Sequence, residues 1–253
     1  MRNRFWIGAA GLLCMGCVCA CQPELKDARL MSYNVKNGCG LDDSTDYART
    51  AAVIRKENPD VVAVQELDSV TGRSGGAYVL GELAKHTGMY DTYAPAIDFD
   101  GGKYGIGILS KEKPLHVYRR ALPGREEART MLVTEFEDYV YICTHLSLTE
   151  EDRTASLPII KEEIARFKKP VFIAGDWNAT PESAFLKEMQ DEFTVLTDMT
   201  QPTFPADTPD STLDYIAVNK GAGLKMNGKK AYTVDAPVQS DHRPVVVVAE
   251  WSE

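Results

Sequence analysis

The chain has 253 residues, of which 44% are hydrophobic, and its 37 acidic against 28 basic residues give a formal net charge of −9. This composition excludes a disordered chain, because it holds enough apolar residues for a substantial core. The acidic balance disfavours a general nucleic-acid-binding surface, since affinity for polyanions draws mainly on lysine and arginine.

The first 20 residues have the pattern of a bacterial export signal. Arg2 and Arg4 precede an uncharged stretch of 16 residues, Phe5 to Ala20, which is short for a membrane span. Small residues then precede Cys21, as at a lipoprotein signal-peptidase site. We therefore expect residues 1–20 to be removed and Cys21 to carry a lipid, with residues 21–27 as a tether and 28–253 as a single domain. The expected location is the bacterial cell envelope, on its periplasmic or outer side.

The cysteines do not predict a disulfide framework. Cys14 and Cys17 have the spacing of a metal or redox motif, but a cluster in the export signal would be discarded with it. Only Cys39 and Cys143 remain in the predicted domain, and the sequence leaves open whether they pair. Without residues 1–20 the chain keeps 26 basic against 37 acidic residues, a net charge of −11.

Apolar patterning predicts strands interleaved with helices. The expected strands are residues 28–35, 60–66, 104–109, 116–120, 131–136, 140–145, 170–175, 213–218 and 244–249. Helices are expected over residues 46–58, 78–86 and 149–168, where Pro158 either kinks the last helix or marks its start. Several strands are apolar on both faces, so we expect an α+β sandwich of two largely antiparallel sheets packed face to face with helices outside.

Polar side chains gather where the predicted strands end. Glu66 and His145 each end a strand, Asp176 and Asn178 follow another, and Ser240–His242 precedes the last. Each cluster alone has an ordinary interpretation, as a surface turn or as a structural histidine. Their repetition at the ends of buried strands indicates one shared site.

Together these segments resemble the endonuclease/exonuclease/phosphatase superfamily over roughly residues 28 to 250. The resemblance rests on seven blocks in the family's order, namely Ser32–Asn34, Val64–Glu66, Gly105–Ser110, Thr144–Leu146, Gly175–Asn178, Leu213–Ile216 and Ser240–His242. It implies a four-layer αββα sandwich and a hydrolase that cleaves phosphate esters with a divalent cation.

The resemblance also implies the metal ligands. Glu66 is expected to be the main ligand, with Asn34 near it and Asp241 at the same mouth. Oxygen ligands indicate a hard cation, and a sparse set of carboxylates suits Mg²⁺ because this ion keeps several waters. Mn²⁺ or Ca²⁺ is the alternative.

The remaining site residues take catalytic roles by the same resemblance. Asp176 is expected to orient the attacking water and accept its proton, while Asn178 donates a hydrogen bond to the phosphate. His242, held in its protonated form by Asp214, is expected to contact the phosphate. His145 is expected to bind phosphate or to protonate the leaving group.

Departures from the nuclease members shift the expected substrate. Asp68 stands two residues after Glu66, where those nucleases place a basic residue, and no glutamate precedes Gly105 to pair with His145. His145 is also a residue that abasic-site endonucleases lack. We therefore expect a phosphorylated small molecule or lipid headgroup as substrate, and a monomeric enzyme held at the membrane by its lipid. An exported nuclease is the alternative.

Two further classes stay open, a catalytically silent module that holds a phosphorylated ligand or glycan and a structural envelope lipoprotein. Singly, Glu66 has the ordinary interpretation of a turn cap, Asp214 of a partner for a surface lysine, and Asn34 of an Asx-turn. Arg129 and Arg153 are expected to be solvated rather than catalytic. The expected rims of the site are the segments Gly72–Gly76, Ile97–Gly102 and Thr203–Asp210.

Overall fold

The computed structural model describes residues 24–222 and 225–252. The expected export signal and Cys21, the residue expected to carry a lipid, lie outside the described residues. Strand β1 (Lys26–Asn34) begins inside the segment expected to be a tether, so the first sheet starts earlier than predicted. None of the helices in the described ranges has both the length and the apolar character needed to cross a bilayer.

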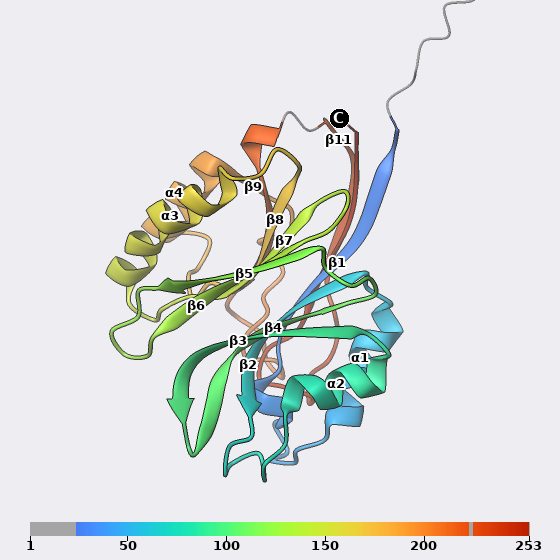
Figure 1. Ribbon diagram of the computed structural model, residues 1–253, viewed down its shortest axis with the longest axis vertical. Helices are drawn as coiled ribbons and strands as arrows, with labels where there is room; N and C mark the ends of the chain where they lie inside the picture. Colours follow the sequence, from blue (N-terminus) through green and yellow to red (C-terminus); the bar gives the residue numbers. More distant parts are fainter. Residues whose placement is uncertain (1–23, 223–224, 253) are drawn as a thin grey trace, which may run out of the picture.

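Within the described residues, two sheets of six strands each lie face to face (Figure 1). The order in the first sheet is β11 (Lys225–Thr233), β12 (Val245–Ser252), β1, β2 (Val61–Ser69), β4 (Gly102–Ser110) and β3 (Tyr90–Phe99). The order in the second is β5 (His116–Leu122), β6 (Arg129–Glu135), β7 (Val140–His145), β8 (Val171–Asp176), β10 (Asp214–Asn219) and β9 (Phe193–Val195). Only the pairs β1–β2 and β7–β8 are parallel in these described sheets, so the largely antiparallel α+β sandwich is confirmed.

Helices on both outer faces complete the four layers (Figure 1). The first sheet is covered by α1 (Tyr47–Glu57) and α2 (Val79–Thr87), and the second by α3 (Glu150–Ile164) and α4 (Ala184–Glu192). Two short 3-10 helices, η1 (Lys36–Gly38) and η2 (Lys220–Ala222), follow β1 and β10. Between the sheets, apolar side chains from both inner faces form a common core, in which Phe172 packs edge-on against Trp251 with ring centroids 5.4 Å apart.

The first helix shows how local chemistry sets its ends. The Asp46 side chain accepts a hydrogen bond from the Arg49 backbone N at 2.9 Å and so caps α1. At the other end Asn58 adopts the left-handed conformation before Pro59, which cannot continue the helix. In α3, by contrast, Pro158 lies inside a helix that begins at Glu150, so it does not mark the start.

The sequence patterns missed β3, β9, β11 and α4. β3, β9 and β11 are edge strands. The long ones, β3 and β11, have almost no buried residues, so they lack the alternation by which a half-buried strand is recognised. Because β3 was missed, the segment Ile97–Gly102 was expected to be a loop. It forms the tip of the β3–β4 hairpin, and its turn residues Asp100 and Gly101 have positive φ.

Candidate active site

The strand directions bring the polar side chains to one end of the sandwich. Asn34, His145 and Asp176 are the last residues of β1, β7 and β8. Because β10 and β12 run antiparallel to these strands, Asp214 at the start of β10 reaches the same end, as does His242 just before β12. The site predicted from separate strand ends is thus one cluster.

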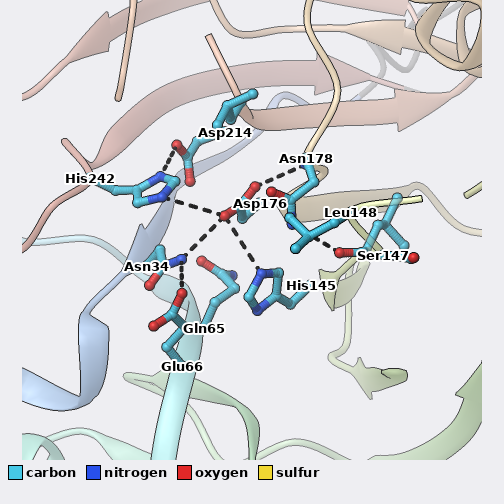
Figure 2. Close-up of polar contacts among 12 residues, drawn as sticks. Asn34, Gln65, Glu66, His145, Ser147, Leu148, Asp176, Asn178, Asp214 and His242 are labelled. Carbon is cyan, nitrogen blue, oxygen red and sulfur yellow. Dashed lines mark hydrogen bonds and ion pairs between the residues drawn. The ribbon is translucent and has the colours of Figure 1, made fainter. Parts of the chain in front are cut away.

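Asp176 lies at the centre of this cluster (Figure 2). Its Oδ2 accepts a hydrogen bond from Asn34 Nδ2 at 3.2 Å and lies 3.7 Å from His145 Nε2 and 3.6 Å from His242 Nε2. Its Oδ1 accepts a hydrogen bond from the Asn178 backbone N at 2.9 Å. The residue is 2% exposed. A buried carboxylate with three side chains turned toward one oxygen is held in a single orientation.

The turn after β8 depends on glycine. Gly175 has φ +155°, and a Cβ there would lie 2.0 Å from the Thr144 carbonyl oxygen on the neighbouring strand. Asn178 follows in the left-handed conformation with φ 49°, and its Nδ2 donates a hydrogen bond to the Leu146 carbonyl at 2.9 Å. One amide hydrogen of Asn178 therefore stays available for the expected contact with phosphate.

Glu66 stands at an irregularity in β2. The pairing of β2 with β4 shifts register between Val64 and Leu67, and Glu66 has φ 59°, which is uncommon for a residue with a side chain. Its Oε1 accepts a hydrogen bond from Asn34 Nδ2 at 3.0 Å. Such a distortion is often found next to active sites because it redirects one side chain.

The surroundings of Glu66 suit a cation. Burial raises the pKa of Glu66, the hydrogen bond from Asn34 opposes this, and the negative charges of Asp241 and Asp176 raise the pKa further. A buried glutamate with two further carboxylate charges near it is a donor set that a hard divalent ion neutralises. The residues predicted as metal ligands therefore fit Mg²⁺ in chemistry.

His242 and Asp214 form a buried pair. His242 Nδ1 and Asp214 Oδ2 are 2.9 Å apart. Burial lowers the pKa of His242, but the charges of Asp214 and Asp176 outweigh it and raise the pKa to about 10. The Phe204 ring covers the imidazole with centroids 4.8 Å apart. The expected pairing of Asp214 with His242 is observed, and no lysine among the described residues pairs with Asp214.

Asp176, Asp214 and His242 also place one potential ligand atom each within 4.8 Å of the others. In this state His242 Nδ1 is hydrogen-bonded to Asp214 Oδ2, and the charges of Asp214 and Asp176 keep the ring protonated at neutral pH. A charged imidazole between two carboxylates instead neutralises them through hydrogen bonds. Glu66 with its neighbours remains the better metal site.

His145 differs from His242 although both face Asp176. Burial lowers the pKa of His145 to about 4, the charge of Asp176 opposes this, and the positive charges of Arg129 and His242 add to the lowering. His145 is therefore neutral at neutral pH in this state. A neutral imidazole can donate one hydrogen bond to a phosphoryl oxygen, which agrees with the phosphate-binding half of its predicted role.

The prediction that Arg129 and Arg153 are solvated was wrong. Arg129 is 6% exposed and its Nη1 pairs with Glu127 Oε1 at 2.7 Å, while a cavity of about 10 Å³, lined by Tyr104 and His145 among others, lies beside it. Arg153 is 7% exposed, and its Nη1 donates to the carbonyls of the loop after β7. Nearby carboxylates and carbonyls compensate their burial, which the spacing of charges along the sequence does not reveal.

Some residues that hold the site together by hydrogen bonds were assigned no role from the sequence. Ser240 Oγ donates to the Asn34 carbonyl at 2.8 Å and so joins the loop before β12 to the end of β1. Asn34 Oδ1 accepts from the Lys36 backbone N at 3.2 Å, so the Asx-turn and the site role occur in the same residue. Ser240 lies in a block that the sequence analysis identified, but its hydrogen bond to Asn34 depends on the fold.

The sequence left open whether Cys39 and Cys143 pair. Both are free in the structure.

The segment Thr203–Asp210 borders the site as predicted. Phe204 packs on His242, and the Ala206 backbone N donates to the Asp241 carbonyl at 2.7 Å. Arg243 N donates in turn to the Thr203 carbonyl at 2.7 Å. These bonds fix the loop against the residues that precede β12.

Comparison with known proteins extends these observations. A model of the endonuclease/exonuclease/phosphatase family matches residues 31–242. Comparison with curated proteins gives no match.

Solved structures share the architecture. An endonuclease/exonuclease/phosphatase from Bacteroides vulgatus has a TM-score of 0.72 at 16% identity, over 90% of this chain and 99% of that one. One from Beutenbergia cavernae has a TM-score of 0.67 at 22% identity, over 89% of this chain and 71% of that one. A mannosyl-6-phosphatase from Bacteroides thetaiotaomicron has a TM-score of 0.66 at 14% identity, over 87% and 98%. At these identities the likeness concerns the fold.

Proposed function

Because the chain belongs to the endonuclease/exonuclease/phosphatase family, whose members are hydrolases of phosphoester bonds, we propose that it hydrolyses a small, soluble phosphoester with the help of a divalent cation. The observation that carries the proposal is the convergence of Asn34, His145 and His242 on one oxygen of Asp176. These groups place several hydrogen-bond donors within 4 Å of a proton acceptor, which is the set of groups that phosphoester hydrolysis needs.

The proposed chemistry divides between two kinds of side chain. Asp176 orients a water molecule and accepts its proton as the water attacks phosphorus. His242, kept protonated by Asp214, offers Nε2–H to a phosphoryl oxygen, where negative charge increases in the transition state. Asn178 and neutral His145 add hydrogen bonds that orient the phosphate.

The expected metal ligands are Glu66, Asn34 and Asp241, with Mg²⁺ as the ion and Mn²⁺ or Ca²⁺ as alternatives. When bound there, the cation supplies positive charge next to the phosphoryl and leaving oxygens. The mutual repulsion of the carboxylates around Glu66 supports this assignment. Asn34, which donates to both Glu66 and Asp176, links the metal site to the water-activating carboxylate.

Glu66→Gln is expected to remove the response of the protein to Mg²⁺. A cation that binds only the folded chain stabilises it, so 5 mM Mg²⁺, if about 100-fold above Kd, should stabilise the wild type by about 2.7 kcal/mol. The neutral amide of glutamine keeps the shape of Glu66 but removes its negative charge. The thermal unfolding temperature of the variant should therefore not rise with Mg²⁺. Differential scanning fluorimetry of the full chain in detergent measures the shift. Glu112→Gln, at an exposed site between β4 and β5, should respond like the wild type, and an equal Mg²⁺ response in Glu66→Gln would refute the assignment.

Strand direction favours a soluble substrate over a lipid headgroup. β1 runs from Lys26 to Asn34, and the eight steps between these residues span about 26 Å at the usual rise. An anchor at Cys21 would stand five residues before Lys26, and such a segment reaches at most about 18 Å. With the lipid in the membrane, the site would therefore face away from the bilayer. The envelope lipoprotein itself remains a proposal from the sequence pattern of residues 1–21.

Hydrolysis of a phosphoester panel by the full chain, with and without EDTA, tests the proposed function. Phosphate release from small monoesters or diesters in Mg²⁺ that stops with EDTA is the expected result. No turnover of any ester would leave the silent binding module as the better proposal. Nuclease activity is the second candidate, and strong nicking of plasmid DNA at 150 mM salt would favour it over a small substrate. The acidic balance predicts that nicking is weak, because net negative charge opposes the binding of a polyanion.

A further inference from the structure

Asp68 occupies the position where nuclease relatives are expected to carry a basic residue, and it holds an arginine in place. Asp68 is fully buried, and its Oδ2 and Oδ1 accept hydrogen bonds from Arg73 Nε at 2.9 Å and Arg73 Nη2 at 2.7 Å. Thr71 Oγ1 donates to Oδ2 as well, at 2.9 Å. The buried carboxylate is thus satisfied, and the guanidinium is fixed in one plane.

The Arg73 guanidinium packs over two aromatic rings. The Arg73 Cζ lies 4.7 Å from the centre of the Phe99 ring and 5.7 Å from that of Tyr104. The Arg73 backbone N donates to Asp100 Oδ2 at 2.5 Å, which ties the loop after β2 to the β3–β4 hairpin. Two of the rims expected from the sequence therefore meet at Arg73.

Arg73 and the two rings beneath it, Phe99 and Tyr104, lie next to the active site. Asp68 pairs with Tyr104 across β2 and β4, and Tyr104 lines the small cavity that His145 also lines. The hydrogen bonds that Arg73 donates to Asp68 raise the pKa of Arg73, its partial burial lowers it, and the charge of Glu66, two residues before Asp68 on β2, raises it further. Arg73 thus stands beyond the metal site on the side of the β3–β4 hairpin, where its exposed end can contact the part of a substrate outside the phosphate.

The free atoms of Arg73 indicate what kind of group it can bind. Its Nη1 has no hydrogen-bond partner among the described residues, and the side chain is 44% exposed. Asp68 neutralises the charge of Arg73, so this place attracts a second phosphate only weakly. Two free N–H donors beside the partly exposed Phe99 ring match a hydroxylated group with apolar C–H faces, as in a sugar.

We propose that Arg73, positioned by Asp68 and Phe99, determines specificity by donating hydrogen bonds from Nη1 to an uncharged, hydroxylated leaving group of the phosphoester. This inference rests on the proposed function, because it assigns the part of the same substrate that lies beyond the scissile phosphate. The selectivity comes from hydroxyl groups, since a leaving group without them leaves the donors of Nη1 unpaired. A sugar phosphate is the substrate class that fits.

The test compares two monoesters that differ in their hydroxyl groups. Mannose 6-phosphate and cyclohexylmethyl phosphate both carry a phosphorylated primary alcohol on a six-membered ring, and only the first has ring hydroxyls. The full chain in detergent with Mg²⁺ should have the higher kcat/KM for mannose 6-phosphate. Arg73→Lys keeps the charge beside Asp68 but loses Nη1, so it should lower this value about 10- to 100-fold while changing that of cyclohexylmethyl phosphate less than about twofold.

Arg166→Lys is the matched control. Arg166 is 43% exposed, lies over the Tyr118 and Phe167 rings at 4.4 and 5.8 Å, and pairs with the buried Glu163, at the opposite end of the sandwich. It should leave both kcat/KM values unchanged. If Arg73→Lys fails to fold by thermal unfolding, Phe99→Leu replaces it, and this loss of the ring under Arg73 should reduce the same preference.

The outcomes separate this inference from the function beneath it. Wild-type turnover of cyclohexylmethyl phosphate without preference for mannose 6-phosphate overturns the role of Arg73 and leaves the phosphoesterase standing. Equal losses on both esters in Arg73→Lys have the same consequence, since they indicate a general effect on the site. Absence of turnover on both esters and on the wider panel overturns both proposals.

Discussion

Asp176→Asn is expected to lower kcat by about 1,000-fold or more with little change in the fold. Asparagine has nearly the same shape, so the hydrogen bond from the Asn178 backbone to Oδ1 at 2.9 Å can persist. The amide cannot accept the proton of the attacking water, and it also loses the charge that faces His145 and His242. Steady-state phosphate release at saturating substrate and Mg²⁺ measures the loss.

A matched substitution separates chemistry from stability. Asp27→Asn changes an exposed aspartate on β1 at the far end of the sandwich and should leave kcat unchanged. Both variants should unfold within a few degrees of the wild type. Retention of more than a tenth of the wild-type kcat in Asp176→Asn would mean that another group accepts the proton, and the roles around Asp176 would have to be reassigned.

The buried layers of the fold were the part that the sequence predicted well. Strands such as Val61–Ser69 and Val171–Asp176 consist largely of apolar residues because both faces are covered, one by the facing sheet and one by helices. Edge strands such as Tyr90–Phe99 carry no such signal, since they are exposed along much of their length. Strand order is set by pairing between distant segments, and no pattern within one segment encodes it.

The site was predictable to the extent that its residues lie in short ordered blocks. Asn34, Asp176 and His242 come together because the strands that carry them end or begin at one end of the sandwich. The environment of each side chain was not predictable in this way. The burial of Arg129 beside His145 depends on carboxylates that are available only in the folded chain, and the φ of 59° at Glu66 depends on the pairing of β2 with β4.

The two histidines illustrate how far environment separates residues of one type. Both lie within 4 Å of Asp176 Oδ2, yet burial lowers the pKa of His145 to about 4, whereas His242, despite its burial, has a pKa raised to about 10 by Asp214 and Asp176. The two pKa values differ because a second carboxylate, Asp214, lies beside His242, whereas the positively charged Arg129 lies near His145. One histidine is thus a neutral donor and the other a cation at neutral pH.

Asp214→Asn is expected to lower kcat/KM about 100-fold at pH 8 and to move the alkaline limb of its pH profile to lower pH by at least about one unit. In the wild type, His242 keeps its proton up to about pH 10 because Asp214 and Asp176 outweigh its burial. Removing the Asp214 charge lets burial dominate, so His242 loses its proton closer to neutrality. Initial rates between pH 5 and 10.5 measure both changes.

Stability should respond to pH in the same direction. The pKa of His242 is raised in the folded protein from an ordinary value of 6.5 to about 10, so the folded state holds the proton more tightly than the unfolded chain. The stabilisation is complete below about pH 6.5 and is lost as the pH rises through 10. Asp214→Asn should therefore lose more stability at pH 6 than at pH 10.5, measured by urea unfolding beside Asp27→Asn.

The catalytic prediction has its own contrary outcome. If the alkaline limbs of the kcat/KM profiles coincide in Asp214→Asn and the wild type, the charge of His242 does not support catalysis.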